Sequence, residues 1–581
     1  ALLKGGKVVI STATKNLQDQ LFFNDIPKIR EALKISVKVN ILKGRGNYIC
    51  KLRMENTIQE GMFFNKEDAQ HLHFIKAFSD NTDSGEVSEI SEIPETSTIW
   101  PMVTSTKENC LGQDCEFYKE CFLVKARKEA LESEVLIVNH HLFFADFVLK
   151  DEELSEILPK ANTIIFDEAH QIPLVASFFL GQFISSSQIS NLIQDCQQGL
   201  KKYPDTIKVL DALSKDLQEI IFELKKIVSP FPARLNINNL KNYENFEKTY
   251  NSLIEKLELL GITLSKHSEE NAELQKLFER SSELNIKFSS WLKKDNQNNI
   301  YWLEVFARTV QFNETPISIS EQFNKFQEKS DSAWIFTSAT LSINGSFDHF
   351  VKLLGLEKAM TQYLQSPFNY SENAFLYVPK EIPDSKDELF NLVLVKKALP
   401  LLKASKGRAF VLATSLKSME EIGALLKDEL KKNEIDYPVI TQGEGPKSDL
   451  LQQFKKHGNA ILIGSLSFWE GIDVRGPALS LVIIDKLPFQ SPGDPVFESK
   501  IKLLSEEGIN AFMSMQLPEA IIRLKQGVGR LIRDDHDKGV MVICDKRIIE
   551  KSYGIKIWKS LPPFKRTRNE SAVINFLEEL E

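Results

Sequence analysis

Two adjacent carboxylates, Asp167 and Glu168, follow a short apolar run at residues 163–166 that is typical of a buried strand. Ligands bind at the carboxyl ends of the strands in open α/β sheets, so this pair is placed where a nucleotide would bind. Asp167 would hold Mg²⁺, and Glu168 would polarise the water that attacks ATP. His170 would couple the site to the rest of the molecule. The alternative is an ordinary acidic helix start, where carboxylates favour the helix dipole.

Two arginines far along the chain could supply the positive charge that phosphoryl transfer needs in its transition state. Arg530 and Arg533 are spaced i, i+3 within a predicted helix at residues 516–533, so both would lie on one face, with Gln526 one turn earlier. A solvated basic face is the alternative.

Four of the six cysteines lie within the first 121 residues of the chain, with 59, 4 and 5 residues between them: Cys50, Cys110, Cys115 and Cys121. This clustering indicates a metal site in a reducing compartment rather than a disulfide framework. Paired C-x₂-C knuckles, which are usual for zinc, do not occur among the four. One distant and three close ligands are compatible with a cubane cluster. Spacing alone favours iron–sulfur over zinc and leaves incidental thiols as a third alternative.

Basic residues follow the last of these cysteines, at Lys125, Arg127 and Lys128, with aromatic residues nearby. The whole chain is acidic, with a net charge of -8, so DNA binding would depend on such local surfaces. Ordinary surface lysine is the alternative. If the three bind DNA, their replacement with Ala weakens single-strand binding and its salt dependence.

The elements that must position these groups follow from the apolar pattern of the 581 residues. Short apolar runs at residues 8–10, 135–138, 163–166 and 334–336 predict one parallel sheet. Runs at 409–412, 438–440, 460–463, 481–484 and 540–543 alternate with helical patterns and predict a second, doubly wound sheet. Between them, residues 172–330 carry apolar stripes at steps of three and four, which predict packed amphipathic helices. No apolar run is long enough for a membrane span.

Several short sequence motifs follow one another along the chain in the order that a known family shows. Residues 166–170 resemble the DEAH form of the Walker B motif, and residues 526–533 resemble motif VI (QxxGRxxR) of superfamily 2 helicases. Residues 11–14 resemble motif Ia, 337–341 motif III and 464–476 motif V. Together these motifs resemble the XPD/DinG-type iron–sulfur DNA helicases over nearly the whole chain. The segments 486–489 and 491–495 resemble the DinG branch in particular.

The resemblance implies an α/β architecture of two RecA-like motor domains with two insertions. The first motor domain would comprise residues 1–43, 126–171 and 331–365, interrupted by an iron–sulfur domain at 44–125 and a helical Arch domain at 172–330. The second would comprise residues 366–581.

The resemblance also assigns roles to individual residues. The four cysteines would hold a 4Fe–4S cluster, and Arg530 and Arg533 would act as arginine fingers on an ATP bound between the motor domains. In motif V, the residues that would contact the nucleotide are Glu470, Gly471 and Asp473. In motif Ia, Thr12 and Thr14 would contact the DNA backbone. The protein would move 5′ to 3′ on single-stranded DNA, act on forked or flapped duplexes in repair or replication, and be a cytoplasmic monomer.

One expected motif is missing from these 581 residues. A phosphate-binding loop needs G-x-x-x-x-G-K-S/T between a strand and a helix, and no segment matches. Gly5, Gly6 and Lys7 precede a strand, which is the wrong context. In the family the loop lies just upstream of motif Ia, so we expect the natural chain to extend beyond Ala1 and the 581-residue chain not to hydrolyse ATP. The rival hypothesis is a non-motor iron–sulfur protein that binds nucleic acid or senses redox state.

Overall fold

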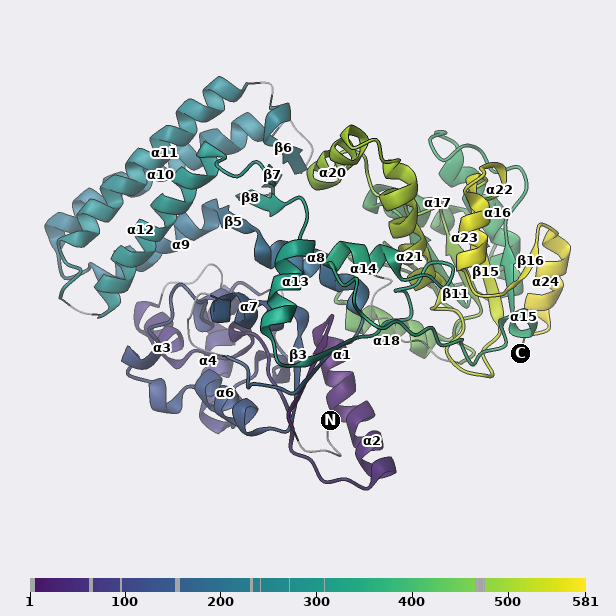
Figure 1. Ribbon diagram of the computed structural model, residues 1–581, viewed down its shortest axis with the longest axis horizontal. Coiled ribbons are helices and arrows are strands. Elements are labelled where there is room, and N and C mark those ends of the chain that lie inside the picture. The colour runs from purple at the N-terminus through teal and green to yellow at the C-terminus, as the bar shows by residue number, and fades with distance from the viewer. Residues whose placement is uncertain are drawn as a thin grey trace. The chain divides into compact units, whose positions relative to one another are not determined.

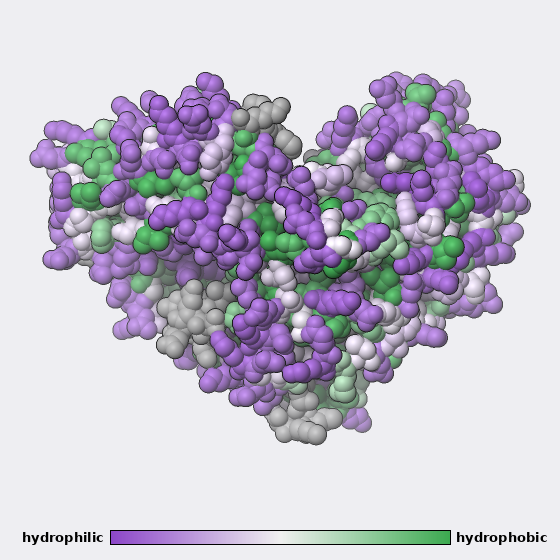
Figure 2. Space-filling model, turned by 45° about the horizontal axis from the view of Figure 1, so that its top comes forward, coloured by the Kyte–Doolittle hydropathy of each residue, from purple (hydrophilic) through white to green (hydrophobic). Residues whose placement is uncertain are grey.

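The computed structural model describes residues 6–61, 66–94, 97–151, 157–229, 234–240, 242–270, 272–307, 309–465, 468, 474 and 476–580. The chain forms two compact units. Unit 1 comprises Ala1–Thr337 and Pro492–Lys502, and unit 2 comprises Ser338–Ser491 and Leu503–Glu581. No described helix is both long and apolar enough to cross a membrane. The face drawn in Figure 2 is mostly hydrophilic with smaller apolar areas.

Unit 1 is built on a parallel five-stranded sheet in the order β2-β3-β1-β4-β9. The strands are β1 (Val8–Thr12), β2 (Val39–Ile41), β3 (Val135–Asn139), β4 (Thr163–Phe166) and β9 (Ala333–Phe336). Four of them confirm the predicted strands. Most side chains of the three central strands are buried, because helices cover a parallel sheet on both faces. The helices that follow the first and third strands are α1 (Lys15–Gln20), α2 (Ile26–Leu33) and α7 (His140–Asp151).

The segment between β2 and β3 carries the four clustered cysteines and has a small core of its own. Its helices are α3 (Lys51–Glu60), α4 (Lys66–Asn81), α5 (Trp100–Val103) and α6 (Phe122–Glu132). Tyr48, Ile49, Ile75 and Phe122 are among the residues that pack into this core. This is the region in which we predicted an iron–sulfur domain at residues 44–125.

Between β4 and β9 lies the helical insertion predicted at residues 172–330. Its helices are α8 (Ile172–Leu180), α9 (Ser186–Gly199), α10 (Pro204–Val228), α11 (Tyr243–Ser265), α12 (Ala272–Lys293) and α13 (Ser320–Lys329). Helices α10, α11 and α12 lie side by side (Figure 1). Most residues of the predicted apolar stripes are buried between them, including Leu217, Tyr250 and Phe288.

The insertion also contains an antiparallel sheet that the sequence did not predict. Its strands β5 (Gln182–Ser185), β6 (Arg234–Asn236), β7 (Asn299–Val305) and β8 (Val310–Pro316) are ordered β5-β8-β7-β6. The insertion is therefore a mixed helical and β domain.

Unit 2 is built on a parallel seven-stranded sheet in the order β12-β13-β11-β14-β15-β10-β16. Its strands are β10 (Ala374–Tyr377), β11 (Ala409–Ala413), β12 (Val439–Thr441), β13 (Ile461–Ser465), β14 (Leu481–Ile484), β15 (Gly539–Ile543) and β16 (Lys565–Thr567). The main helices beside it are α16 (Phe390–Ala404), α17 (Leu416–Lys432), α18 (Lys447–His457) and α21 (Leu517–Val528). The five strands predicted for this unit are confirmed, and with them the prediction of two doubly wound parallel sheets.

Candidate functional site

Asp167 follows β4 at the carboxyl edge of the unit 1 sheet, and the neighbouring strand β1 orients it. The Asp167 amide donates to the carbonyl of Ser11 at 2.8 Å, which continues the strand pairing by one residue. Thr12 Oγ1 then donates to Asp167 Oδ2 at 2.8 Å. Thr12 has no exposed surface, and its hydroxyl positions the Asp167 carboxylate. Its expected contact with the DNA backbone stays a prediction. Thr14 accepts a hydrogen bond from the amide of Leu17 and caps α1.

Glu168 is held in an unusual backbone conformation directly after Asp167. Its φ of 49° and ψ of 44° lie in the left-handed region, which costs a non-glycine residue roughly 1 kcal/mol or more and is frequent at functional sites. Thr337, after β9, fixes both sides of this turn. Its amide donates to Phe166 O at 2.9 Å, and its carbonyl accepts from the amide of Ala169 at 3.0 Å. His170 Nδ1 lies 3.3 Å from Glu168 Oε2. The structure thus brings Asp167, Glu168 and His170 together on one rigid turn.

The electrostatics of this turn favour a bound cation. Burial raises the pKa of Asp167, the hydrogen bond from Thr12 opposes that rise, and the charge of Glu168 adds to it. A divalent cation would offset both the burial and the repulsion of the two carboxylates. The donor set of carboxylate oxygens, open to water on one side, is the kind that Mg²⁺ prefers. The residues present therefore fit a magnesium ion.

A buried histidine lies behind the carboxylates. His140, at the end of β3, has no exposed surface, and its Nδ1 is 2.7 Å from Ser11 Oγ. Burial lowers the pKa of His140 to about 3, so its ring is neutral at physiological pH. His140 therefore joins the ends of β3 and β1, the strand that orients Asp167. No local signal in the sequence marked this contact.

The arginines predicted to act on the phosphates lie in unit 2, just after a helix. Gln526 is on α21, but this helix ends at Val528. The prediction that Arg530 and Arg533 share a helix face is therefore wrong, because both follow the helix. Buried Asp537 shapes this turn, since its carboxylate accepts from the amides of Arg533 at 2.8 Å and Asp534 at 2.9 Å.

Asp537 also binds the end of the motif V segment, where the amide of Gly476 donates to Asp537 Oδ1 at 3.1 Å. Motifs V and VI are thus joined through one side chain. The predicted nucleotide contacts Glu470, Gly471 and Asp473 lie outside the described residues.

The four clustered cysteines are half-buried free thiols. Cys50 and Cys121 directly precede helices α3 and α6 and occupy their N-cap positions. Burial raises the pKa of both Cys50 and Cys115, and in each case negative charge on Cys110 and Cys121 raises it further. Cys110 and Cys121 therefore lie within electrostatic range of both Cys50 and Cys115.

This donor set is suited to a thiolate-bound metal group. Sulfur ligands select zinc and iron–sulfur centres, and the mutual repulsion of four thiolates is relieved by a cationic centre. Among the described residues, the side chains of His, Cys, Asp and Glu do not form a group of three or more that could hold a metal ion as they stand.

The three basic residues of α6 have different surroundings. Lys125 Nζ is 3.1 Å from Asp83 Oδ1, and Lys128 is exposed. Arg127 is half-buried and within electrostatic range of Cys110 and Cys121. Burial and the charge of Arg45 lower the pKa of Arg127, whereas these cysteines oppose the change. Of the trio, Arg127 therefore lies toward the thiols, and Lys128 is the residue best placed for an external ligand.

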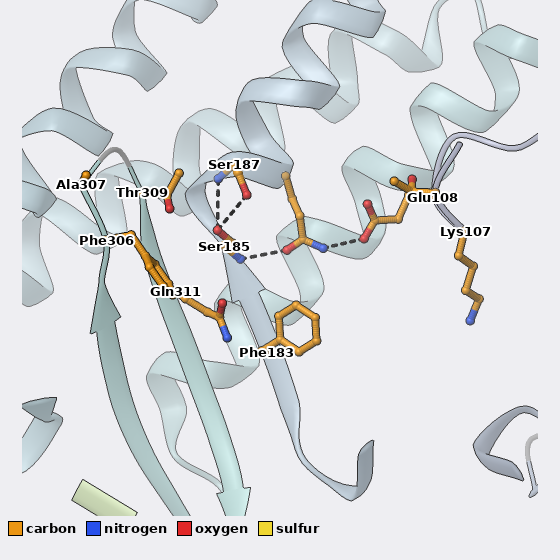
Figure 3. A pocket seen from close by; sticks show the side chains of 11 residues that line it. Lys107, Glu108, Phe183, Ser185, Ser187, Phe306, Ala307, Thr309 and Gln311 are labelled. Atoms are coloured by element: carbon orange, nitrogen blue, oxygen red, sulfur yellow. Dashed lines mark hydrogen bonds between the residues drawn. The ribbon is translucent and has the colours of Figure 1, made fainter. Parts of the chain in front are cut away.

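A cavity of about 750 Å³ separates the cysteine region from the sheet of the insertion (Figure 3). Gln188 Nε2 donates to Glu108 Oε1 at 2.6 Å across it, and Gln188 Oε1 accepts from the amide of Ser185. Two aromatic rings on its wall are exposed, Phe183 by 41% and Phe306 by 45%. Lys107 also lines this cavity. The bases of a single nucleic-acid strand can stack on exposed aromatic rings, and a lysine can neutralise a phosphate of its backbone.

Comparisons with known proteins agree with this arrangement. The family described as a helicase C-terminal domain matches residues 398–564. The ATP-dependent DNA helicase YoaA of Haemophilus influenzae is 40% identical over the whole chain, which covers 90% of that protein. The ATP-dependent helicase DinG of Mycobacterium tuberculosis is 29% identical over 99% of this chain and 88% of its own.

Among solved structures, an XPD helicase superposes with a TM-score of 0.58 at 18% identity, over 98% of this chain and 92% of its own. At that identity the likeness concerns the fold alone. The identity over the whole chain, together with the two parallel sheets and their motifs, shows that the chain belongs to the YoaA/DinG family of XPD-like superfamily 2 helicases.

Proposed function

We propose that this protein is an ATP-dependent DNA helicase that moves 5′ to 3′ along single-stranded DNA. The observation that carries the proposal is the turn at Asp167 and Glu168, held by Thr12 and Thr337 at the carboxyl edge of a parallel sheet. The relationship over the whole chain to proteins named as ATP-dependent DNA helicases supports it. We further propose that it acts as a monomer on forked or flapped duplexes in repair or replication.

The roles of the motor residues follow from their chemistry. Asp167, oriented by Thr12, would hold Mg²⁺, which would supply positive charge for the phosphates. Glu168 orients the attacking water and accepts its proton, and His170 senses the state of Glu168 through their 3.3 Å contact. Arg530 and Arg533 stabilise the negative charge of the transition state, as arginine fingers do.

The cysteine region is proposed to hold a 4Fe–4S cluster through Cys50, Cys110, Cys115 and Cys121. When bound, such a cluster joins four points of a segment that has only a small core of its own. Arg127 contributes positive charge beside two of the ligands. The nearby exposed Lys128, Thr14 at the start of α1, and the rings of Phe183 and Phe306 provide the DNA-binding surface.

The direct test compares two forms of the protein, the 581-residue chain and a form that also carries a phosphate-binding loop. We expect the loop-bearing form to hydrolyse ATP when single-stranded DNA is added and to unwind a duplex with a 5′ single-stranded tail. We expect the 581-residue chain to bind DNA without steady ATP turnover, because it has no loop to hold the phosphates. If the loop-bearing form bound DNA but neither hydrolysed ATP nor unwound duplex, the non-motor hypothesis would replace the proposal.

The basic trio of α6 gives a sharper prediction for DNA binding. Lys128→Ala should weaken single-strand affinity and make the slope of log K against log salt shallower by about 0.7, the value for one lost phosphate contact. Lys125→Ala is the matched control one turn away, and its effect should be smaller because Asp83 already neutralises Lys125. Arg127→Ala should leave the salt slope unchanged and lower the bound iron. Equal slopes for Lys128→Ala and the parent protein would exclude Lys128 from the binding surface.

A further inference from the structure

The segment 492–502 packs with unit 1, although the chain on both sides of it belongs to unit 2. It contains most of the motif at residues 491–495 and most of helix α20 (Pro495–Glu506). Asp494 caps this helix, because its Oδ1 accepts from the amide of Phe497 at 2.9 Å. The segment is thus a structured excursion of the second motor domain, and neither the nucleotide site nor the cysteines account for it.

The main contact of this segment is an ion pair with the helical insertion. Arg234, the first residue of β6, donates through Nη1 to Asp494 Oδ2 at 2.7 Å and through Nε to Glu304 Oε1 at 3.0 Å. Its guanidinium also stacks 4.8 Å from the ring of Trp302. Asp494 is well shielded, with its side chain only 11% exposed. Arg234 is therefore held by its own sheet on one side and by the 492–502 segment on the other.

Two further hydrogen bonds extend the contact along α20. Asn236 Nδ2 donates to Ser499 Oγ at 3.1 Å, and Asn239 Nδ2 donates to Glu498 Oε2 at 3.3 Å. The contact thus involves β6, the turn after it and the first turns of α20. All three bonds join side chains, so the sequence at these positions specifies the pairing.

The insertion is bound at another place to the cysteine region. Gln188, in the first turn of α9, bonds to Glu108 at 2.6 Å. Near the other end of α9, Asp195 lies between two arginines, Arg280 at 2.7 Å and Arg53 of α3 at 3.6 Å. The insertion is therefore attached through α9 to the cysteine region and through β6 to the excursion from the second motor domain.

We propose that Arg234 is a positioning residue that makes the insertion move with the second motor domain during the ATP cycle, through its pair with Asp494. The proposal rests on the proposed helicase function. The 492–502 segment is joined by the backbone at both ends to unit 2, so a shift of that unit pulls on the segment, and the ion pair transmits the shift to β6. Without the pair, ATP is still hydrolysed, but less of the motion reaches the insertion and less DNA is unwound per ATP.

The test uses charge-neutralising variants of the two acids that share Arg234. Asp494→Asn removes the negative charge that the 492–502 segment presents to Arg234, and it keeps a side-chain oxygen that can cap α20. Glu304→Gln removes the other charge, which lies within the insertion, and is the matched control. The first measurement is amide hydrogen exchange over residues 234–239 and 497–502. Asp494→Asn should accelerate exchange there by about fivefold, as expected for loss of a partly screened ion pair, and Glu304→Gln should accelerate residues 234–239 alone.

The second measurement is the number of base pairs unwound per ATP in the loop-bearing form. It should fall for Asp494→Asn, with DNA-stimulated ATP hydrolysis retained, and stay at the parental value for Glu304→Gln. Equal behaviour of the two variants in either measurement, or unchanged unwinding per ATP in Asp494→Asn, would overturn the proposal. Ser499→Ala, which removes the Asn236 contact together with the bond from Ser499 to the Pro495 carbonyl within α20, gives a milder version of the same test if Asp494→Asn fails to fold. A parent protein that does not unwind DNA contradicts the proposed function, whereas hydrogen exchange tests the contact independently.

Discussion

Replacement of Glu168 with Gln is expected to lower DNA-stimulated ATP hydrolysis by about 100-fold or more in the loop-bearing form. This is the usual contribution of a positioned general base. Gln has nearly the shape of Glu, so the left-handed turn and its bonds to Thr337 are preserved. It cannot accept the proton of the attacking water. ATP binding should persist, because Asp167 retains its charge and its bond to Thr12. Steady-state hydrolysis and equilibrium nucleotide binding, measured on the same preparation, separate the two effects.

The control for this variant is Glu132→Gln, which neutralises an exposed carboxylate of the same unit that pairs with Lys38. Its hydrolysis rate should equal that of the parent protein. A rate loss of less than about tenfold in Glu168→Gln would assign the base to another group. Loss of nucleotide binding together with hydrolysis would instead give Glu168 a role in holding the metal ion.

The parts of the fold that could be predicted are those whose signal is local. Strands of a parallel sheet are buried on both faces, so β3, β4, β11 and β14 are nearly continuous apolar runs. The helices of the insertion show stripes because one face of each packs on its neighbours. The carboxylate pair was predictable for the same reason, since a buried strand leads directly into it.

Two strands of the insertion sheet could not be predicted, because β5 and β6 pair with strands far away in the sequence, whereas β7 and β8 form a local hairpin. Strand β5 pairs with β8, so that Ser185 lies opposite Gln311, and β7 begins and ends with partly exposed residues. Strands β5 and β6 are also only four and three residues long and mixed in polarity, which resembles a loop. Pairing partners so distant in sequence leave no periodic signal that a single sequence would reveal.

The end of α21 was missed because a side chain that follows the helix, and not a usual stop signal, shapes the turn there. Residues 529–533 contain no proline, and Gly529 has φ of -66°, so the left-handed glycine that usually ends a helix is absent there. The turn is set instead by Asp537, whose carboxylate binds the amides of Arg533 and Asp534. The contact between Thr12 and Asp167, by contrast, joins distant parts of the sequence. Two strand ends 155 residues apart meet only because β1 and β4 are neighbours.

Replacement of Cys110 with Ser is expected to remove nearly all bound iron from the protein. Cys110, like Cys121, interacts electrostatically with both Cys50 and Cys115, so its loss removes one of the two proposed ligands that lie near the distant cysteine. Metal sites in small domains contribute on the order of 10 kcal/mol to folding. The region from α3 to α6, whose own core is small, should therefore lose hydrogen-exchange protection, whereas β11 and β14 of unit 2 keep theirs. Iron and acid-labile sulfide analysis provides the direct readout.

Cys196→Ala is the matched control for this experiment, because the thiol of Cys196 is fully buried in the insertion. Burial raises its pKa to about 12, so it remains a neutral thiol and an unsuitable ligand. Its replacement leaves a small cavity and should lower stability modestly while iron and sulfide stay at the parental level. Equal iron in Cys110→Ser and Cys196→Ala would show that the clustered thiols do not hold the metal group. Loss of iron confined to Cys110→Ser, with exchange increased only between α3 and α6, would identify the cluster as the structural support of that region.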